Sequence, residues 1–122
     1  MAGKITTYTA NEAANVNLGQ VGCSVLTAAA DSLTPPSGCV IIAIQVLEAS
    51  TKIDSLVAED PSRWMNTASA AHDQTDGTET SLIGAGGDTF PTAAYLMQGF
   101  TIYGRWTSVS VSAGAIIAYF GK

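Results

Sequence analysis

The chain has 122 residues, of which 47% are hydrophobic and 12% are charged, and its net charge is −5. This length predicts a single domain, residues 1–122, with its own core. An ordinary globular chain carries about 25% charged residues, so we expect much of this surface to be covered by other subunits or by a partner. The five basic residues are scattered, whereas nucleic acid and anionic membranes require clustered Lys and Arg, so neither is an expected partner.

The first ten residues, MAGKITTYTA, have no apolar segment of the kind that a secretory signal needs. The longest apolar runs, such as 39–44, are too short to cross a bilayer. We therefore expect a protein that is made and used without crossing a membrane.

The N-terminal third predicts two short strands. Lys4–Thr9 (KITTYT) is a candidate edge strand, and a polar, Asn-rich loop follows at 11–20. Gly22–Thr27 is the second strand, rich in residues that favour a pleated surface. The cluster Pro35–Gly38 (PPSG) breaks any regular element and predicts an exposed turn.

Cys39–Glu48 (CVIIAIQVLE) is the best candidate for a central strand. Alternation predicts one face with Val40, Ile42, Ile44 and Val46, and another with Ile41, Ala43 and Leu47. Both faces are apolar, so we expect both to be covered. A buried helix is the rival interpretation, and the short length and β-branched residues argue against it.

Thr51–Val57 (TKIDSLV) predicts the next strand, with Ile53 and Ser55 on one face and Leu56 on the other. A long loop region follows at about 58–88, with weak strand signals such as Glu79–Ile83. A loop of this length is usually functional or flexible.

The densest strand-forming stretch is Gly99–Gly121, around which we expect the rest of the chain to be organised. Its alternation places Phe100, Ile102 and Trp106 on one face. The pair Ala113–Gly114 predicts a hairpin turn, and Ala115–Phe120 the returning strand.

In total, the sequence predicts six to eight short strands with turn signals between them, and it contains no internal repeat. This pattern predicts an all-β fold, an antiparallel β-sandwich with jelly-roll-like character and one long loop region at about 58–88.

The two cysteines, Cys23 and Cys39, fit no metal or redox motif. Each lies beside strand-forming apolar residues, where a free thiol behaves as a small hydrophobe. Buried free thiols and a disulfide both remain open at this point.

The segment His72–Gly77 (HDQTDG) is the one cluster with metal-ligand chemistry. It lacks the alternating acidic ligands and terminal Glu of a calcium loop, so we expect an exposed polar loop and no metal. Gly84–Gly87 (GAGG) has no following Lys and no helix, and predicts a flexible turn rather than a phosphate loop. We expect no cofactor.

The chain is predicted not to be an enzyme. It has one His and no plausible Ser–His–Asp order along the sequence. Carboxylates near the central strands, including Asp54 and Glu59, leave a cell-wall hydrolase as the alternative from another class.

Aromatic and guanidinium side chains are the candidate interface residues, because Arg, Trp and Tyr are enriched at binding hot spots. They are Tyr103, Arg105, Trp106, Trp64 and Tyr119. An intrachain ion pair is an equally good interpretation of Arg105. Trp64 also predicts that the long loop region is anchored rather than disordered.

Two segments resemble small structural proteins of tailed bacteriophages, of marine and cyanobacterial phages in particular. TIYGRWTSVSVSAGAIIAYFG (101–121) looks like their C-terminal hairpin, and VIIAIQVLEASTKIDSLVAED (40–60) is similar to their central strand pair. The resemblance implies a virion component, best matched by a capsid decoration (cement) protein: a small all-β module, often a trimer, that clamps the outer shell.

This resemblance implies the major capsid protein as partner, a homotrimer as the assembly, and the virion, assembled in the host cytoplasm, as the location. An acidic chain suits docking on basic patches of a shell. The alternative is a tail or fibre adsorption module that binds a host-surface glycan by stacking on Trp64 or Tyr95.

Overall fold

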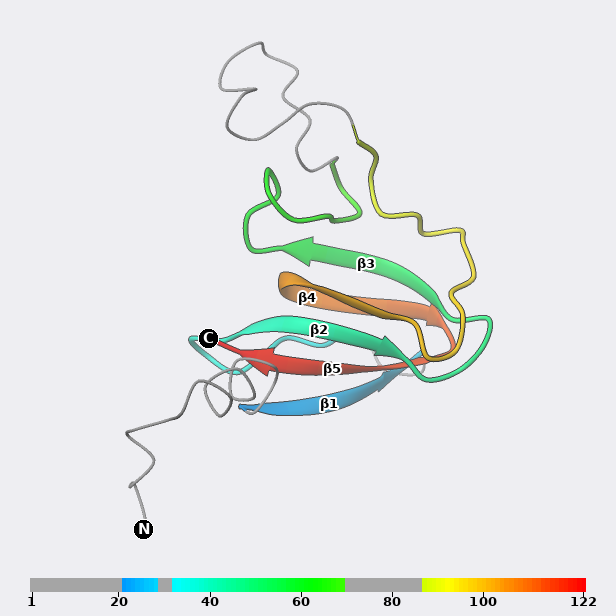
Figure 1. Cartoon of the computed structure of the whole chain (residues 1–122), viewed down its shortest axis with the longest axis horizontal. Helices are drawn as coiled ribbons and strands as arrows, with labels where there is room; N and C mark the ends of the chain where they lie inside the picture. Colours follow the sequence, from blue (N-terminus) through cyan, green and yellow to red (C-terminus); the bar gives the residue numbers. More distant parts are fainter. Residues whose placement is uncertain (1–20, 29–31, 70–86) are drawn as a thin grey trace.

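The computed structural model describes residues 21–28, 32–69 and 87–122, and every strand in this part belongs to one antiparallel sheet (Figure 1). The strands are β1 Gly22–Thr27, β2 Val40–Val46, β3 Lys52–Ala58, β4 Thr101–Ala113 and β5 Ala115–Gly121. Their order across the sheet is β1-β5-β2-β4-β3. The all-β prediction is confirmed. The strands predicted at 4–9 and 79–83 lie outside the described residues.

Strand β4 doubles back on itself, which folds the sheet around its core. Thr101 pairs with Gln45 of β2, and Ala113 pairs with Lys52 of β3. In a straight strand those ends would lie about 40 Å apart, whereas the chain from Gln45 to Lys52 spans at most about 25 Å. Figure 1 shows the two halves of β4 running in opposite directions.

The bend lies at Thr107. Trp106 pairs with Ala58 and Ser108 pairs with Val57, so Thr107 has no partner in β3. Such a bulge increases local twist and bends a strand. All five strands contribute to one buried cluster, with Ile44, Leu56 and Ile116 fully buried. The described strands thus form one folded sheet, and the finer sandwich or jelly-roll form stays a prediction.

The predicted terminal hairpin is only half right. Gly114 makes the turn, with φ of 80°, and β5 returns as expected. The two strands are not neighbours, however, because β2 lies between β5 and β4. The reason is the bend in β4: its first half pairs with β2 and its second half with β3, so β5 pairs along the other edge of β2.

The predicted alternation fails in β2 and β3 because each contains a bulge. The register breaks between Ile41 and Ala43, so Ile41 and Ile44 belong to the same core cluster although they were expected on opposite faces. In β3 the break lies between Ile53 and Ser55, and it turns Ile53 and Leu56 toward the same core.

Candidate functional site

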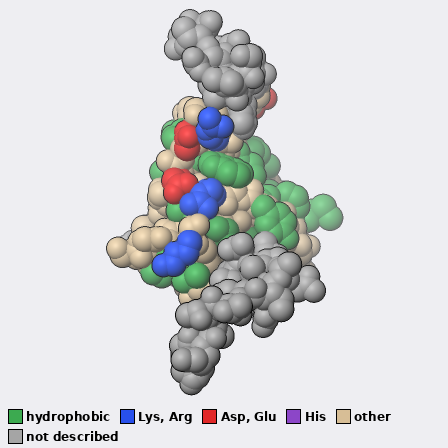
Figure 2. All heavy atoms as spheres, turned by 60° about the vertical axis from the view of Figure 1, so that its left-hand side comes forward, with side chains coloured by type: hydrophobic (Ala, Val, Ile, Leu, Met, Phe, Trp, Pro, Cys, Tyr) green, Lys and Arg blue, Asp and Glu red, His purple; other side chains and the backbone are tan. Residues whose placement is uncertain are grey.

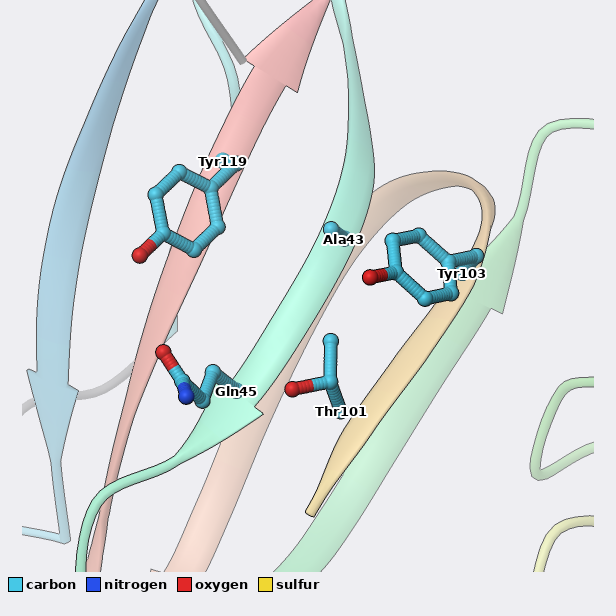
Figure 3. A pocket seen from close by; sticks show the side chains of 5 residues that line it. All are labelled: Ala43, Gln45, Thr101, Tyr103 and Tyr119. Carbon is cyan, nitrogen blue, oxygen red and sulfur yellow. The ribbon is translucent and has the colours of Figure 1, made fainter. Parts of the chain in front are cut away.

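The face of the sheet that points away from the core carries a hollow of about 250 Å³. Five side chains of β2, β4 and β5 line it (Figure 3): Ala43, Gln45, Thr101, Tyr103 and Tyr119. None of these residues is charged, and four of the five carry a polar group. The hollow is therefore a neutral site with both aromatic and hydrogen-bonding walls.

The strand register explains why the hollow exists. Ala43 pairs with Tyr103 on one side and with Tyr119 on the other. Strands are about 4.8 Å apart, so the two tyrosines start about 10 Å from each other across one small residue. Because the side chain of Ala43 ends at Cβ, nothing fills the space between the rings (Figure 3).

The polar side chains of the hollow are not used by the fold. In the part of the chain that the structure describes, the side chains of Gln45, Thr101, Tyr103 and Tyr119 make no hydrogen bond or ion pair. Gln45 and Thr101 are register partners, so an amide and a hydroxyl lie together at one end of the hollow. These groups are available to a ligand.

A second surface lies where two turns meet at the end of the sheet. Val46 N–H donates to Phe100 O at 2.8 Å, and Leu96 N–H donates to Thr51 O at 2.8 Å, so the 47–51 turn and the 95–100 segment are held together. Four large apolar side chains are exposed on them: Leu47, Tyr95, Met97 and Phe100. We call these four residues the turn patch.

The turn patch is strongly exposed. The exposed fraction of Met97 is 78% and that of Tyr95 is 64%. Phe100 was expected on one strand face with Ile102 and Trp106, but it precedes the first residue of β4 and is exposed, whereas those two residues are buried. Lys52 Nζ lies 4.4 Å above the ring of Tyr95, a cation–π contact. Exposed clusters of this kind mark interaction surfaces.

The opposite end of the sheet carries a network of charges. Arg105 donates from Nε to Glu59 Oε1 at 2.6 Å and from a second nitrogen to Glu59 Oε2 at 3.3 Å. It also donates to the backbone oxygen of Lys122 at 3.0 Å. The hydrogen bond from Arg105 lowers the pKa of Glu59, and the same bond raises the pKa of Arg105.

Figure 2 shows this polarity on one face of the molecule. Side chains of both charge signs gather in a column toward the viewer, and apolar side chains project at the right-hand edge. Arg63 and Asp60 add a second ion pair at 3.5 Å near the charged end. The two ends of the sheet therefore offer different chemistries to a partner.

The structure separates the five predicted interface residues. Tyr103 and Tyr119 line the hollow, and Arg105 makes the intrachain ion pair with Glu59. Trp106 is fully buried, and its Nε1–H donates to Met65 O at 2.8 Å. Its role in the described chain is therefore in the core, where its ring covers Gly104. An interface formed by these residues stays a prediction.

Trp64 is partly buried and packs against the core together with Met65. This contact and the bond from Trp106 anchor the first part of the long loop region, as the aromatic residue predicted. The remainder of that region, 70–86, lies outside the described residues, as do the HDQTDG segment and most of the GAGG turn.

The turn patch is the surface that sequence reasoning missed. The run Tyr95–Met97 followed by Phe100 is apolar but contains no alternation, so no strand pattern marks it as one surface. The available signal was an apolar run between Pro91 and Gly99 that is too short and too interrupted to be a buried strand.

The two cysteines are free thiols. Cys23 lies in β1, and Cys39 directly precedes β2. Because β5 separates β1 from β2, the two cysteines are at least two strand spacings apart, about 10 Å. A disulfide requires Cα atoms within about 7 Å. Cys23 is exposed rather than buried, and Cys39 is half-buried.

No group of three or more potential metal-ligating side chains occurs within the described ranges. No helix there is long and apolar enough to cross a membrane. Among the carboxylates considered for hydrolysis, Glu59 is held by Arg105 with a lowered pKa, the opposite of the shift that a general acid needs near neutral pH.

Comparisons of the chain with protein-family models, with curated proteins and with solved structures found no match.

Proposed function

We propose that this chain is a virion structural protein, a capsid decoration protein that binds the outer shell of a phage and stabilises it. The observation that carries the proposal is the turn patch, four exposed apolar side chains on two joined turns. Aromatic residues and Met are enriched in the desolvated centre of protein interfaces, whereas charged residues are depleted there. The resemblance of 40–60 and 101–121 to phage structural proteins supplies the identity of the partner, the major capsid protein.

One end of the sheet carries the turn patch and the other carries the Arg105–Glu59 network, an arrangement that suits a protein standing on a shell. The turn patch faces the capsid, and the Arg105–Glu59 end stays in water. The net charge of −5 speeds the approach to basic patches of the shell at low salt, which is an effect on the association rate, whereas the turn patch supplies the binding itself.

The assembly that we propose is a homotrimer, and its mechanism is additive. Each subunit contributes a modest contact, and linking three of them raises the overall avidity by a large factor without any new kind of contact. A trimer bound across neighbouring capsomers bridges them against internal pressure. Light scattering at micromolar concentration checks the assembly: three times the mass of the chain is expected, and a stable monomer that also fails to bind shells would refute it.

Co-sedimentation with expanded capsids of the source phage tests the function. Saturable binding at a fixed ratio to the major capsid protein is expected. The variant Met97→Ser removes the most exposed apolar side chain of the patch and should weaken binding at least tenfold. Val57→Thr is the matched control, because Val57 is also exposed but lies in β3, away from the turns. Equal binding by both variants would reject the turn patch as the contact.

The two aromatic residues suggested for glycan stacking in the adsorption alternative, Trp64 and Tyr95, are both partly covered. Trp64 is partly buried against the core, so its ring is not a free stacking surface. Tyr95 is exposed, but one face of its ring is covered by Lys52. Retention of the protein on host cells or tails, with no binding to shells, would favour this alternative over the decoration function.

A further inference from the structure

We propose that the hollow between Tyr103 and Tyr119 is a binding site for a neutral sugar ring. This inference goes beyond the shell-binding function, because the hollow and the turn patch are lined by different side chains. It rests on the shape of the hollow, on the absence of charge among the lining residues that the structure describes, and on hydrogen-bonding groups that no other described group occupies.

The shape comes from the two tyrosines on either side of Ala43. They stand on different strands, so each ring is placed by its own backbone and neither fills the space over the alanine (Figure 3). A phenol ring has an apolar face and a polar tip. The C–H groups of a sugar ring pack against such a face, while the hydroxyl groups around its edge reach the polar tips.

The hydrogen-bonding groups at the hollow select for hydroxyl groups. The Gln45 amide donates and accepts, and the Thr101 hydroxyl does both as well. Together with the two phenols, they offer a ligand four side chains that no other described group occupies. A hydrocarbon would leave these groups desolvated and unpaired, which costs free energy.

Charge excludes the other ligand classes. Among the described lining residues there is no Lys or Arg to bind an anion and no carboxylate to bind a cation. Arg105 follows Tyr103 on the same face of β4, but Glu59 holds its guanidinium at 2.6 Å. A small ligand with many hydroxyl groups and no charge is the class that satisfies the lining residues. Pockets with a few convergent polar groups among apolar ones are the usual form of such sites.

The test is a titration of the isotopically labelled full-length chain with D-glucose, D-galactose and N-acetyl-D-glucosamine, followed by amide chemical shifts. A single ring on an open site should bind with a Kd of about 1 mM. At least one sugar should shift the amides around Ala43, Tyr103 and Tyr119. No shift at these residues with any of the three up to about 20 mM, some twentyfold above that Kd, would overturn the proposal.

Two variants and one control make the result specific. Ala43→Leu fills the floor between the rings and should lower the affinity at least tenfold, and Tyr119→Ala should do the same by removing one wall. Val25→Ala changes an exposed residue of β1 outside the hollow and should leave the affinity unchanged. Full affinity in either hollow variant, with a folded spectrum, would contradict the assignment.

The charge of the ligand is tested with D-glucuronate, which carries a carboxylate on the same type of ring. Weaker binding than that of D-glucose is expected, and equal or tighter binding would refute the neutral class. The sugar site and the shell-binding function are tested independently of each other. Met97→Ser should leave the sugar titration unchanged, and Ala43→Leu should leave co-sedimentation with capsids unchanged.

Discussion

The substitution Gly114→Ala tests the folding back of β4, because Gly114 joins β4 to β5 at the point where the chain passes Thr51. Two costs combine there. The φ of Gly114 is 80°, which costs an alanine about 1–2 kcal/mol. A Cβ at this position would also lie 2.7 Å from the backbone Cα of Thr51, and such an overlap costs about 1–3 kcal/mol. We expect the free energy of unfolding to fall by about 2–5 kcal/mol.

Two other glycines separate these costs. Gly38 has φ of 81° with nothing within 4 Å of a Cβ, so Gly38→Ala should cost only the backbone penalty of about 1–2 kcal/mol. Gly104 does not have a positive φ, but a Cβ there would lie 2.6 Å from the buried ring of Trp106. Gly104→Ala should therefore cost only the packing penalty of about 1–3 kcal/mol.

Urea unfolding followed by circular dichroism measures all three variants. A domain of this size has a stability of about 5–15 kcal/mol, so the Gly114 variant should show a clearly lower midpoint than either control. If Gly114→Ala cost no more than Gly38→Ala, the close approach of Gly114 to Thr51 would be wrong. The folding back of β4, which brings the two together, would then be wrong as well.

Three further predictions concern single side chains. Thr51→Val removes a buried hydroxyl that donates to the backbone oxygen of Glu48 at 2.7 Å and accepts from the first amide of β5. This change should lower the free energy of unfolding in urea by about 1–3 kcal/mol, whereas Thr27→Val, at an exposed position, should lower it by almost nothing. Trp106→Ala should cost about 3–5 kcal/mol because the ring is core, and an unchanged urea midpoint with lost shell binding would place the ring at an interface instead. The pKa of Glu59, followed by NMR, should lie below its usual value and should rise in Arg105→Gln. Because folding lowers this pKa, the ion pair stabilises the protein above the unfolded pKa, and its contribution disappears as the pH falls through the folded pKa. An unchanged titration of Glu59 in the variant would reject the pairing.

Local patterns predicted the strands well, because strand formation here depends on residues that are close in sequence. Gly22–Thr27 was expected and observed with the same bounds, and the apolar run after Pro36 became the central strand β2. β-Branched residues and flanking turn residues carry this information within a few positions.

Pairing could not be predicted in the same way, because it depends on the partner strand. The bulges near Ile42 and Asp54 shift the faces of β2 and β3, and neither residue has a property that announces a bulge. The long stretch after Gly99 suggested a simple hairpin. Its first strand has 13 residues, however, and its two halves serve two different partners, which no local pattern records.

The same difference between local pattern and strand pairing applies to the candidate site residues. Tyr103 and Tyr119 were singled out as aromatic side chains, but only the register shows that both flank Ala43. Trp106 looked like an interface residue from its type alone, whereas the bend of β4 buries it. The turn patch combines residues from two turns about 50 positions apart, so its members could not be grouped before the fold was known.

The salt dependence of binding to purified capsids tests the central claim most directly, because it asks both whether the protein binds shells and through which chemistry. The Debye length falls from about 10 Å at 0.1 M salt to about 3 Å at 1 M. If the apolar turn patch makes the contact, the bound amount at saturation and the midpoint of the binding curve should persist at about 1 M NaCl, where contacts between exposed charges are screened. Loss of binding at high salt would show that the acidic surface makes the contact, and absence of binding at any salt would contradict the decoration function itself.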